Sequence, residues 1–181
     1  LKKSGNDCSF MHPTLQEYFA ALALTQKLNS LSEEQVNSII KNPNWHDTFI
    51  FYSGLSINPT IIIKKMFDLF LETDNHTFLF LSAKCAAETT NLDIILTDSI
   101  IDSLIKIYSY PDDDFYKYWF NLRSCVQSWN SKHFTNKIIE YFDNSIDTIS
   151  PRIVNVLHHS DDALRNAKGI KKIKQIIIDG T

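Results

Sequence analysis

The chain has 181 residues, of which 44% are hydrophobic and 22% charged, and its formal net charge is -3. Only four glycines and five prolines interrupt it, too few turn-forming residues for a β-sandwich or barrel, so long helices with short connections are expected. The chain has no large basic face, no apolar run of the roughly 18 residues that a membrane span needs and no signal peptide, so we expect no direct nucleic-acid binding, no membrane and a cytoplasmic location.

The first residues predict a strand followed by a helix. The turn signal at residues 5–7 precedes a short, partly apolar stretch at residues 8–12, which indicates one strand of a small hairpin. Pro13 suits the first position of a helix. The residues that follow are apolar on several faces, so we expect this helix to be deeply buried. Its most regular apolar stripe consists of Leu15, Tyr18, Phe19 and Leu22.

Further helices are predicted along most of the remaining chain, separated by caps and breaks. Ser32 as N-cap and Gln35 form a capping box, and the helix that they open should end near residues 42–43. Asp93 is expected to cap a later helix that runs to about Tyr110. Another helix is expected at about 45–54. A break at residues 73–75 separates a helix that carries Ile62, Met66, Leu69 and Phe70 from one that carries Phe78, Leu81, Cys85 and Glu88. Two more helices are expected at 132–147 and 151–159.

An acidic run and an aromatic stripe mark the next helix. Three consecutive acids, residues 112–114, follow Pro111, and we interpret them as a helix start because acids are favourable at the positive end of the helix dipole. A metal site formed by these acids is the alternative.

The aromatic stripe that follows the acids is expected to pack in the core, and a protein-interaction face is the alternative for it. The residues of the stripe are Phe115, Tyr118, Trp119, Leu122, Val126 and Trp129.

These elements predict an all-α fold, an array of helical hairpins with HEAT-like or tetratricopeptide-like packing and a short N-terminal strand. The last segment differs. This segment fits the frame of a leucine-rich repeat strand, with Ile170, Ile173, Ile176 and Ile178 followed by Thr181. A short amphipathic helix with Ile170, Ile173 and Ile177 as its apolar stripe is the alternative. Because the chain begins at Leu1, with residues that look like the middle of a domain, we expect it to be a piece of a longer protein.

Residues 10–21 have the sequence FMHPTLQEYFAA. This segment resembles the end of the winged-helix region in NACHT-family NTPases, which are signal-transduction ATPases. The shared pattern is an aromatic residue, a His two positions later, then a small residue before Gln-Glu-aromatic and Ala-Ala. Trp45 and Gly54-Leu55 resemble further positions of that family. The resemblance covers about residues 8–57 and is strong over 10–24.

The resemblance implies three parts: 1–29 as the tail of the winged helix, 30–168 as a helical domain and 169–181 as a first leucine-rich repeat. It implies a non-catalytic segment that couples a C-terminal sensor to the nucleotide state of an N-terminal core, in signal transduction, autoinhibition and immune or antiphage defence. ATP or ADP with Mg would bind the parent protein. His12 would contact the β-phosphate of ADP only when that core is present.

Other interpretations remain open. His12 could be a helix N-cap without a ligand, and Glu17 could close a capping box with Thr14, so we assign Glu17 to structure. The chain could instead be a helical scaffold that binds a protein through residues 115–129, with Phe115, Tyr118, Trp119 and Trp129 in the interface. A thiol hydrolase using Cys85 or Cys125 is a third alternative. We expect these cysteines and Cys8 to be reduced thiols, and we expect no catalytic residue and no metal site in this chain.

Overall fold

The computed structural model describes residues 2–4, 7–9, 12–89, 91–107, 117–118, 120–125, 136–137 and 140. This part of the chain is mostly helical, which confirms the all-α prediction. The strands are β1 (Lys2–Ser4) and β2 (Asp7–Ser9). The α-helices are α1 (Pro13–Lys27), α2 (Glu33–Lys41), α3 (His46–Leu55), α4 (Thr60–Thr73), α5 (His76–Ala87) and α6 (Ile94–Ile107). Single 3-10 turns at Leu28–Ser30 and Pro43–Trp45 join the first three helices.

The two strands pair antiparallel, with Lys3 opposite Cys8. The second strand covers Asp7–Ser9, whereas the sequence predicts a strand at residues 8–12. Phe10 and Met11 lie outside the described residues. A hairpin with strands of three residues is marginal by itself in water.

Local side-chain chemistry fixes where the helices begin and end. The Ser32 backbone N–H donates to Gln35 Oε1 at 2.8 Å, and the Gln35 N–H donates to Ser32 Oγ at 3.2 Å, so the predicted capping box is confirmed. Asp74 ends α4 in the left-handed region at φ 54°, which breaks the helix. The Asn75 side chain then caps α5 by accepting from Thr77 N–H, so α5 begins at His76, directly after the predicted break at residues 73–75.

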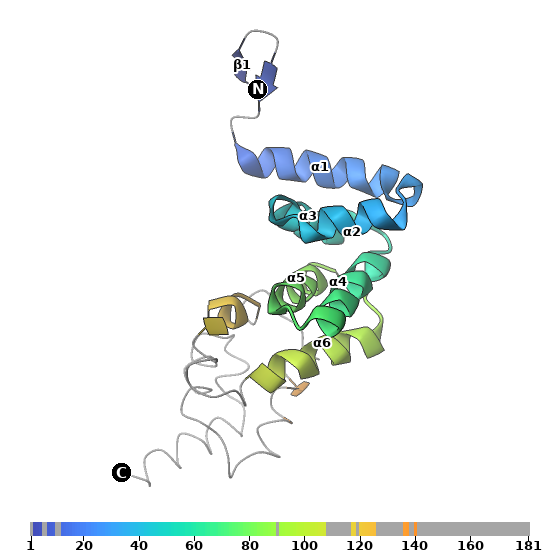
Figure 1. Cartoon of the computed structure of the whole chain (residues 1–181), viewed down its shortest axis with the longest axis vertical. Coiled ribbons are helices and arrows are strands. Elements are labelled where there is room, and N and C mark those ends of the chain that lie inside the picture. The colour runs from blue at the N-terminus through green and yellow to red at the C-terminus, as the bar shows by residue number, and fades with distance from the viewer. Residues whose placement is uncertain are drawn as a thin grey trace, which may run out of the picture.

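The helices stack in layers (Figure 1). Beyond the hairpin comes α1, then α2 and α3, then α4 and α5, with α6 at the far side. The closest pairings are α1 with α3, α4 with α5, α3 with α5 and α5 with α6. The order of contacts therefore runs from the N-terminal helix through α3 and α5 to α6.

The core is centred on α5. Nine of its twelve residues are buried, including the consecutive run from Phe78 to Ala83. Phe49 on α3, Met66 on α4 and Ile101 on α6 are also fully buried. A helix that is apolar on all sides needs neighbours on all sides, and α3, α4 and α6 provide them.

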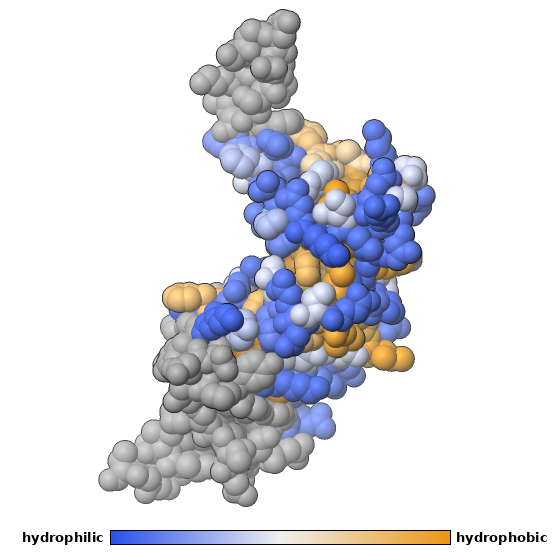
Figure 2. Space-filling view, in the orientation of Figure 1, coloured by the Kyte–Doolittle hydropathy of each residue, from blue (hydrophilic) through white to orange (hydrophobic). Residues whose placement is uncertain are grey.

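The prediction that α1 is deeply buried is wrong. Only Ala21 and Leu24 of this helix are buried, whereas Leu15 is 48% exposed, Phe19 49% and Leu22 40%. The reason is the position of α1 at the end of the stack, where it packs chiefly against α3 with one side. Hydrophobic surface lies along the side of α1 that faces away from the other helices (Figure 2).

Several predictions fall outside the described residues. They are the end of the helix predicted to reach Tyr110, the acidic run 112–114, the helix predicted at 151–159 and the segment 169–181. Of the helix predicted at 132–147, the described residues 136–137 and 140 are helical.

Removal of the capping box should destabilise the fold measurably. We expect Ser32→Ala to lower the free energy of unfolding by about 1 kcal/mol, because the N–H of Gln35 loses its acceptor. Urea unfolding followed by circular dichroism measures this. Ser38→Ala, an exposed position on the same helix, is the matched control and should change stability by less than about 0.5 kcal/mol. Equal effects of the two variants would contradict the role assigned to the cap.

Candidate functional site

His12 occupies the N-cap position of α1. Its backbone is extended (φ -122°, ψ 121°), and its carbonyl accepts hydrogen bonds from the N–H groups of Leu15 and Gln16 at 3.1 and 3.4 Å. Its imidazole is exposed and makes no capping hydrogen bond. Pro13 stands at the first helical position, where its missing N–H costs nothing. The backbone of His12 therefore starts the helix while its ring is not used for the cap.

The alternative capping box of Thr14 with Glu17 is wrong. Thr14 lies inside the first turn of α1, one residue after Pro13, so it cannot be the N-cap. Glu17 lies in the second turn and is half-buried on the side towards α3 and its preceding turn. Its carboxylate is therefore available for a role other than closing the helix start.

The exposed apolar stripe of α1 begins three residues after His12. Leu15, Phe19 and Leu22 follow one another at spacings of four and three residues, which places them on one helix face. The buried residues Ala21 and Leu24 lie on the opposite side. Tyr18, at the edge of the stripe, contacts Phe19 and Phe51 edge-to-face with ring centroids 5.8 and 6.1 Å apart. A partner that covers the N-terminal end of the stripe would lie near His12.

A second apolar surface surrounds a hollow of about 570 Å³ between the end of α1, α2 and the α3–α4 connection. Leu55, Ile57 and Ile61 line it, and Ile57 is 93% exposed. At its rim Lys65 Nζ and Glu33 Oε1 form an ion pair at 2.6 Å. This surface is not among the features predicted from the sequence. The signal for it in the sequence is an isoleucine that stands in a turn between Ser56 and Asn58.

The described part of the aromatic stripe 115–129 faces inward. The Tyr118 ring stacks on His76 with centroids 4.3 Å apart and lies 5.9 Å from the Phe80 ring. Leu122 and Cys125 are buried, whereas Phe120 is 79% exposed. Tyr118 is half-buried, so its position agrees with core packing, the favoured interpretation of the stripe. The other predicted interface residues, Phe115, Trp119 and Trp129, lie outside the described residues.

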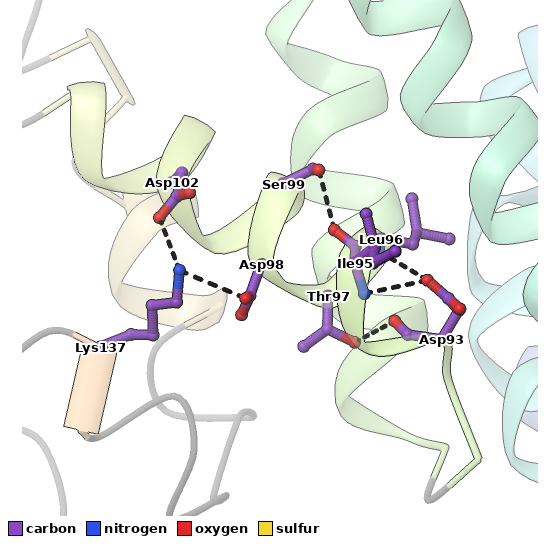
Figure 3. A network of polar contacts seen from close by, with 8 residues as sticks. All are labelled: Asp93, Ile95, Leu96, Thr97, Asp98, Ser99, Asp102 and Lys137. Atoms are coloured by element: carbon purple, nitrogen blue, oxygen red, sulfur yellow. Dashed lines mark hydrogen bonds and ion pairs between the residues drawn. The ribbon is translucent and has the colours of Figure 1, made fainter.

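A polar network joins residue 137 to α6 (Figure 3). Lys137 Nζ lies 3.4 Å from a carboxylate oxygen of both Asp98 and Asp102, which are one turn apart on α6. Desolvation lowers the pKa of Lys137, but attraction to Asp102 and Asp98 outweighs it, so its pKa lies above the ordinary value. Asp93 caps the same helix as predicted, because its carboxylate accepts from the N–H groups of Ile95 and Leu96 at 2.9 and 3.0 Å.

The two described cysteine thiols are unsuited to nucleophilic catalysis. Cys85 and Cys125 are fully buried, and burial raises the pKa of each thiol to about 12. Cys125 Sγ donates to the Phe80 carbonyl at 3.6 Å. A catalytic cysteine needs an accessible thiol with a lowered pKa, so this geometry counts against the thiol-hydrolase alternative.

His46, the first residue of α3, has a pKa shifted from its ordinary value. Its Nε2 lies 3.3 Å from the Ile40 carbonyl, which joins the beginning of α3 to the end of α2. Burial lowers the pKa of His46, and the nearby Lys84 contributes in the same direction. The Ile40 carbonyl and Asp47 oppose this shift without cancelling it. We assign His46 to the packing of α2 on α3.

Among the described residues, no group of three or more His, Cys, Asp or Glu side chains is arranged to hold a metal ion. In the same part of the chain, no helix is both long enough and apolar enough to cross a bilayer. Comparison of the chain with protein-family models, curated proteins and solved structures finds no match.

Burial of the thiols predicts their reactivity and a pH effect. In a Cys8→Ser background, we expect almost no reaction with dithionitrobenzoate in the native state and reaction of both remaining thiols in urea. Folding raises the pKa of each thiol from about 8.5 in the unfolded chain to about 12. The contribution of the protonated thiols to the free energy of unfolding is therefore complete below pH 8.5 and is lost as the pH rises towards 12. Urea unfolding at pH 7, 8.5 and 10 should show the decrease. Rapid native-state labelling would contradict the assigned burial.

The inward orientation of Tyr118 predicts a contrast with its exposed neighbour. We expect Tyr118→Ala to lower the free energy of unfolding by about 1–3 kcal/mol, because the stack on His76 and the contact with Phe80 are lost. Phe120→Ala, on the exposed side, should change it by less than about 0.5 kcal/mol. Thermal or urea unfolding compares the two variants, and a larger effect at Phe120 would reverse the assignment.

Proposed function

We propose that this chain is a regulatory helical segment of a NACHT-type signal-transduction ATPase. One observation carries the proposal: the outward side of α1 has an exposed apolar stripe, and this stripe begins three residues after His12, whose side chain is also exposed. Both belong to residues 10–24, where the resemblance to the end of the winged-helix region is strongest.

The exposed stripe supports a covering partner on physical grounds. Leu15, Phe19 and Leu22 each keep 40% or more of their surface accessible. Each 100 Å² of apolar surface left in water forgoes about 2.5 kcal/mol of stabilisation, so a protein element that covers the stripe would be favoured. In the proposed protein, this element is the N-terminal ATPase core, folded against α1.

His12 would then report the nucleotide state of the core. With the core docked, an imidazole N–H at the start of α1 could donate to a β-phosphate oxygen of ADP, and hydrogen bonds to charged groups are the stronger ones. Exchange of ADP for ATP would remove this contact and favour release of the helical segment. A contact present in only one of two states shifts the equilibrium between them by its own free energy.

The helical stack would carry the coupling. α1 packs on α3, α3 on α5 and α5 on α6, so a displacement of α1 bears on a continuous series of packed helices. We propose that residues 30–168 form this relay with HEAT-like or tetratricopeptide-like packing, and that residues 169–181 begin a leucine-rich repeat sensor. ATP or ADP with Mg would bind the core, since the sequence of this chain has no G-x-x-x-x-G-K-[ST] loop. The parent protein would act in the cytoplasm, in immune or antiphage defence.

A fluorescent ADP analogue tests the proposal with two proteins: this chain alone, and the chain extended N-terminally through its ATPase core. We expect tight binding only by the longer protein. His12→Ala in the longer protein should weaken binding about 10- to 100-fold, because a charge-assisted hydrogen bond is lost. Ser38→Ala, an exposed polar position on α2 away from the apolar stripe of α1, is the matched control and should leave the affinity unchanged.

The outcomes separate the parts of the proposal. Tight and specific ADP binding by this chain alone would contradict a regulatory segment without its own nucleotide site. If the longer protein binds ADP and His12→Ala does not change its affinity, the proposed phosphate contact is wrong. The proposed docking of α1 on the core would not be contradicted by that result. Leu15→Asp then tests docking directly, since a charge in the covered stripe should separate the core from the helical segment and increase the protease sensitivity of their junction.

A helical scaffold that binds another protein is the second candidate. The specific observation in its favour is the apolar hollow beside Ile57 and Ile61, whereas Tyr118 of the aromatic stripe is turned towards the core.

A further inference from the structure

A groove of about 470 Å³ lies between the N-terminal half of α1 and the turn that leads into α3. Gln16 and Glu17 line it from α1, and Trp45, Asp47 and Thr48 line it from the other side. Glu17 and Trp45 are half-buried, so they form its inner part, while Asp47 is exposed at its edge. Trp45 also packs against the hydrophobic core, which fixes the position of its ring.

The charge of this groove is one-sided. Two carboxylates, those of Glu17 and Asp47, line it, and no lysine, arginine or histidine is among its lining residues. None of the ion pairs found among the described residues involves either carboxylate. Glu33, by contrast, is an exposed acid that forms an ion pair with Lys65. The groove is therefore complementary to a cation that comes from outside the described residues.

We propose that this groove is a docking site for an arginine side chain of a partner protein segment. A guanidinium group can donate bidentate hydrogen bonds to a carboxylate and can stack on an indole ring, and both kinds of group line the groove. An ammonium group of lysine cannot do both with the same geometry, because it is compact and strongly hydrated. The side-chain oxygens of Gln16 and Thr48 are further acceptors at the groove.

The groove borders the exposed side of α1 at Gln16. Successive helical residues are about 100° apart, so Gln16 lies about 60° around the helix from Phe19, whereas Glu17 lies about 160° from it, on the side towards α3. A partner on the stripe of Leu15, Phe19 and Leu22 would thus reach Glu17 only with a segment that extends past Gln16 into the groove. That this partner is the ATPase core rests on the proposed function, but the arginine preference depends only on the groove.

NMR titration of this chain tests the arginine site without the core. N-acetyl-arginine amide is the probe, and the corresponding lysine and citrulline amides are the comparisons. We expect saturable shifts at the Trp45 indole N–H and at the Thr48 amide, with a dissociation constant on the order of millimolar for so small a ligand. The lysine compound should bind at least about threefold more weakly, and uncharged citrulline should cause no saturable shift.

Charge-removing variants make the assignment specific. We expect Glu17→Gln and Asp47→Asn each to weaken binding of the arginine probe about fivefold or more, while each variant keeps the native spectrum. Glu72→Gln, an exposed acid on α4, is the matched control and should change the affinity less than twofold. If Glu17→Gln does not fold, Asp47→Asn decides.

Four results would each overturn the proposal. They are equal shifts with citrulline, shifts located away from the groove, the absence of a saturable shift, and an affinity for the arginine probe that neither groove variant changes. None of these results depends on nucleotide binding. A failure of the arginine site is therefore distinguishable from a failure of the ADP experiment on the longer protein.

Discussion

The burial of α5 is the constraint on which the described fold depends. Nine of the twelve residues of this helix are buried, so it is stable only with neighbours around it. α3, α4 and α6 pack against it, and the stack of Tyr118 on His76 together with the Cys125 contact to the Phe80 carbonyl adds a further neighbour from residues 117–125. Small residues such as Ala83 and Ala86 let these neighbours approach closely. The same burial raises the pKa of both described thiols and removes them from solvent.

α1 stands in contrast to α5, because it is apolar on two sides and covered on one. Ala21 and Leu24 hold it against α3, and Leu15, Phe19 and Leu22 remain accessible at the end of the stack. In stacked helical proteins, each layer covers the apolar side of the layer before it. An end layer whose outer face is apolar is therefore stabilised when another element covers that face. The surface that would receive this element begins three residues after His12 and borders the groove at Gln16. Apolar contact, phosphate sensing and arginine docking would thus act on a single helix.

The polar interactions of the described residues fall into two groups with different roles. The capping interactions of Ser32, Asn75 and Asp93 satisfy helix N–H groups and fix where helices begin. The contacts of Lys137 with Asp98 and Asp102 instead join parts of the chain that are distant in sequence. Exposed ion pairs of this kind contribute little stability individually. Neither group is arranged for proton transfer or nucleophilic attack, and the proposed functions accordingly depend on docking rather than chemistry.

The sequence by itself determined the helices and their ends, because caps, breaks and apolar spacing act within a few residues. Ser32 with Gln35, Asp93 and the break at Asp74 illustrate this. It could not determine which apolar side of α1 is covered, because both sides show helical periodicity and only the placement of α3 separates them. It also could not find the groove at Glu17, because Trp45 and Asp47 are almost thirty positions away and meet α1 only after α2 reverses the chain. The tertiary structure decided these points, since burial depends on neighbours that are distant in sequence.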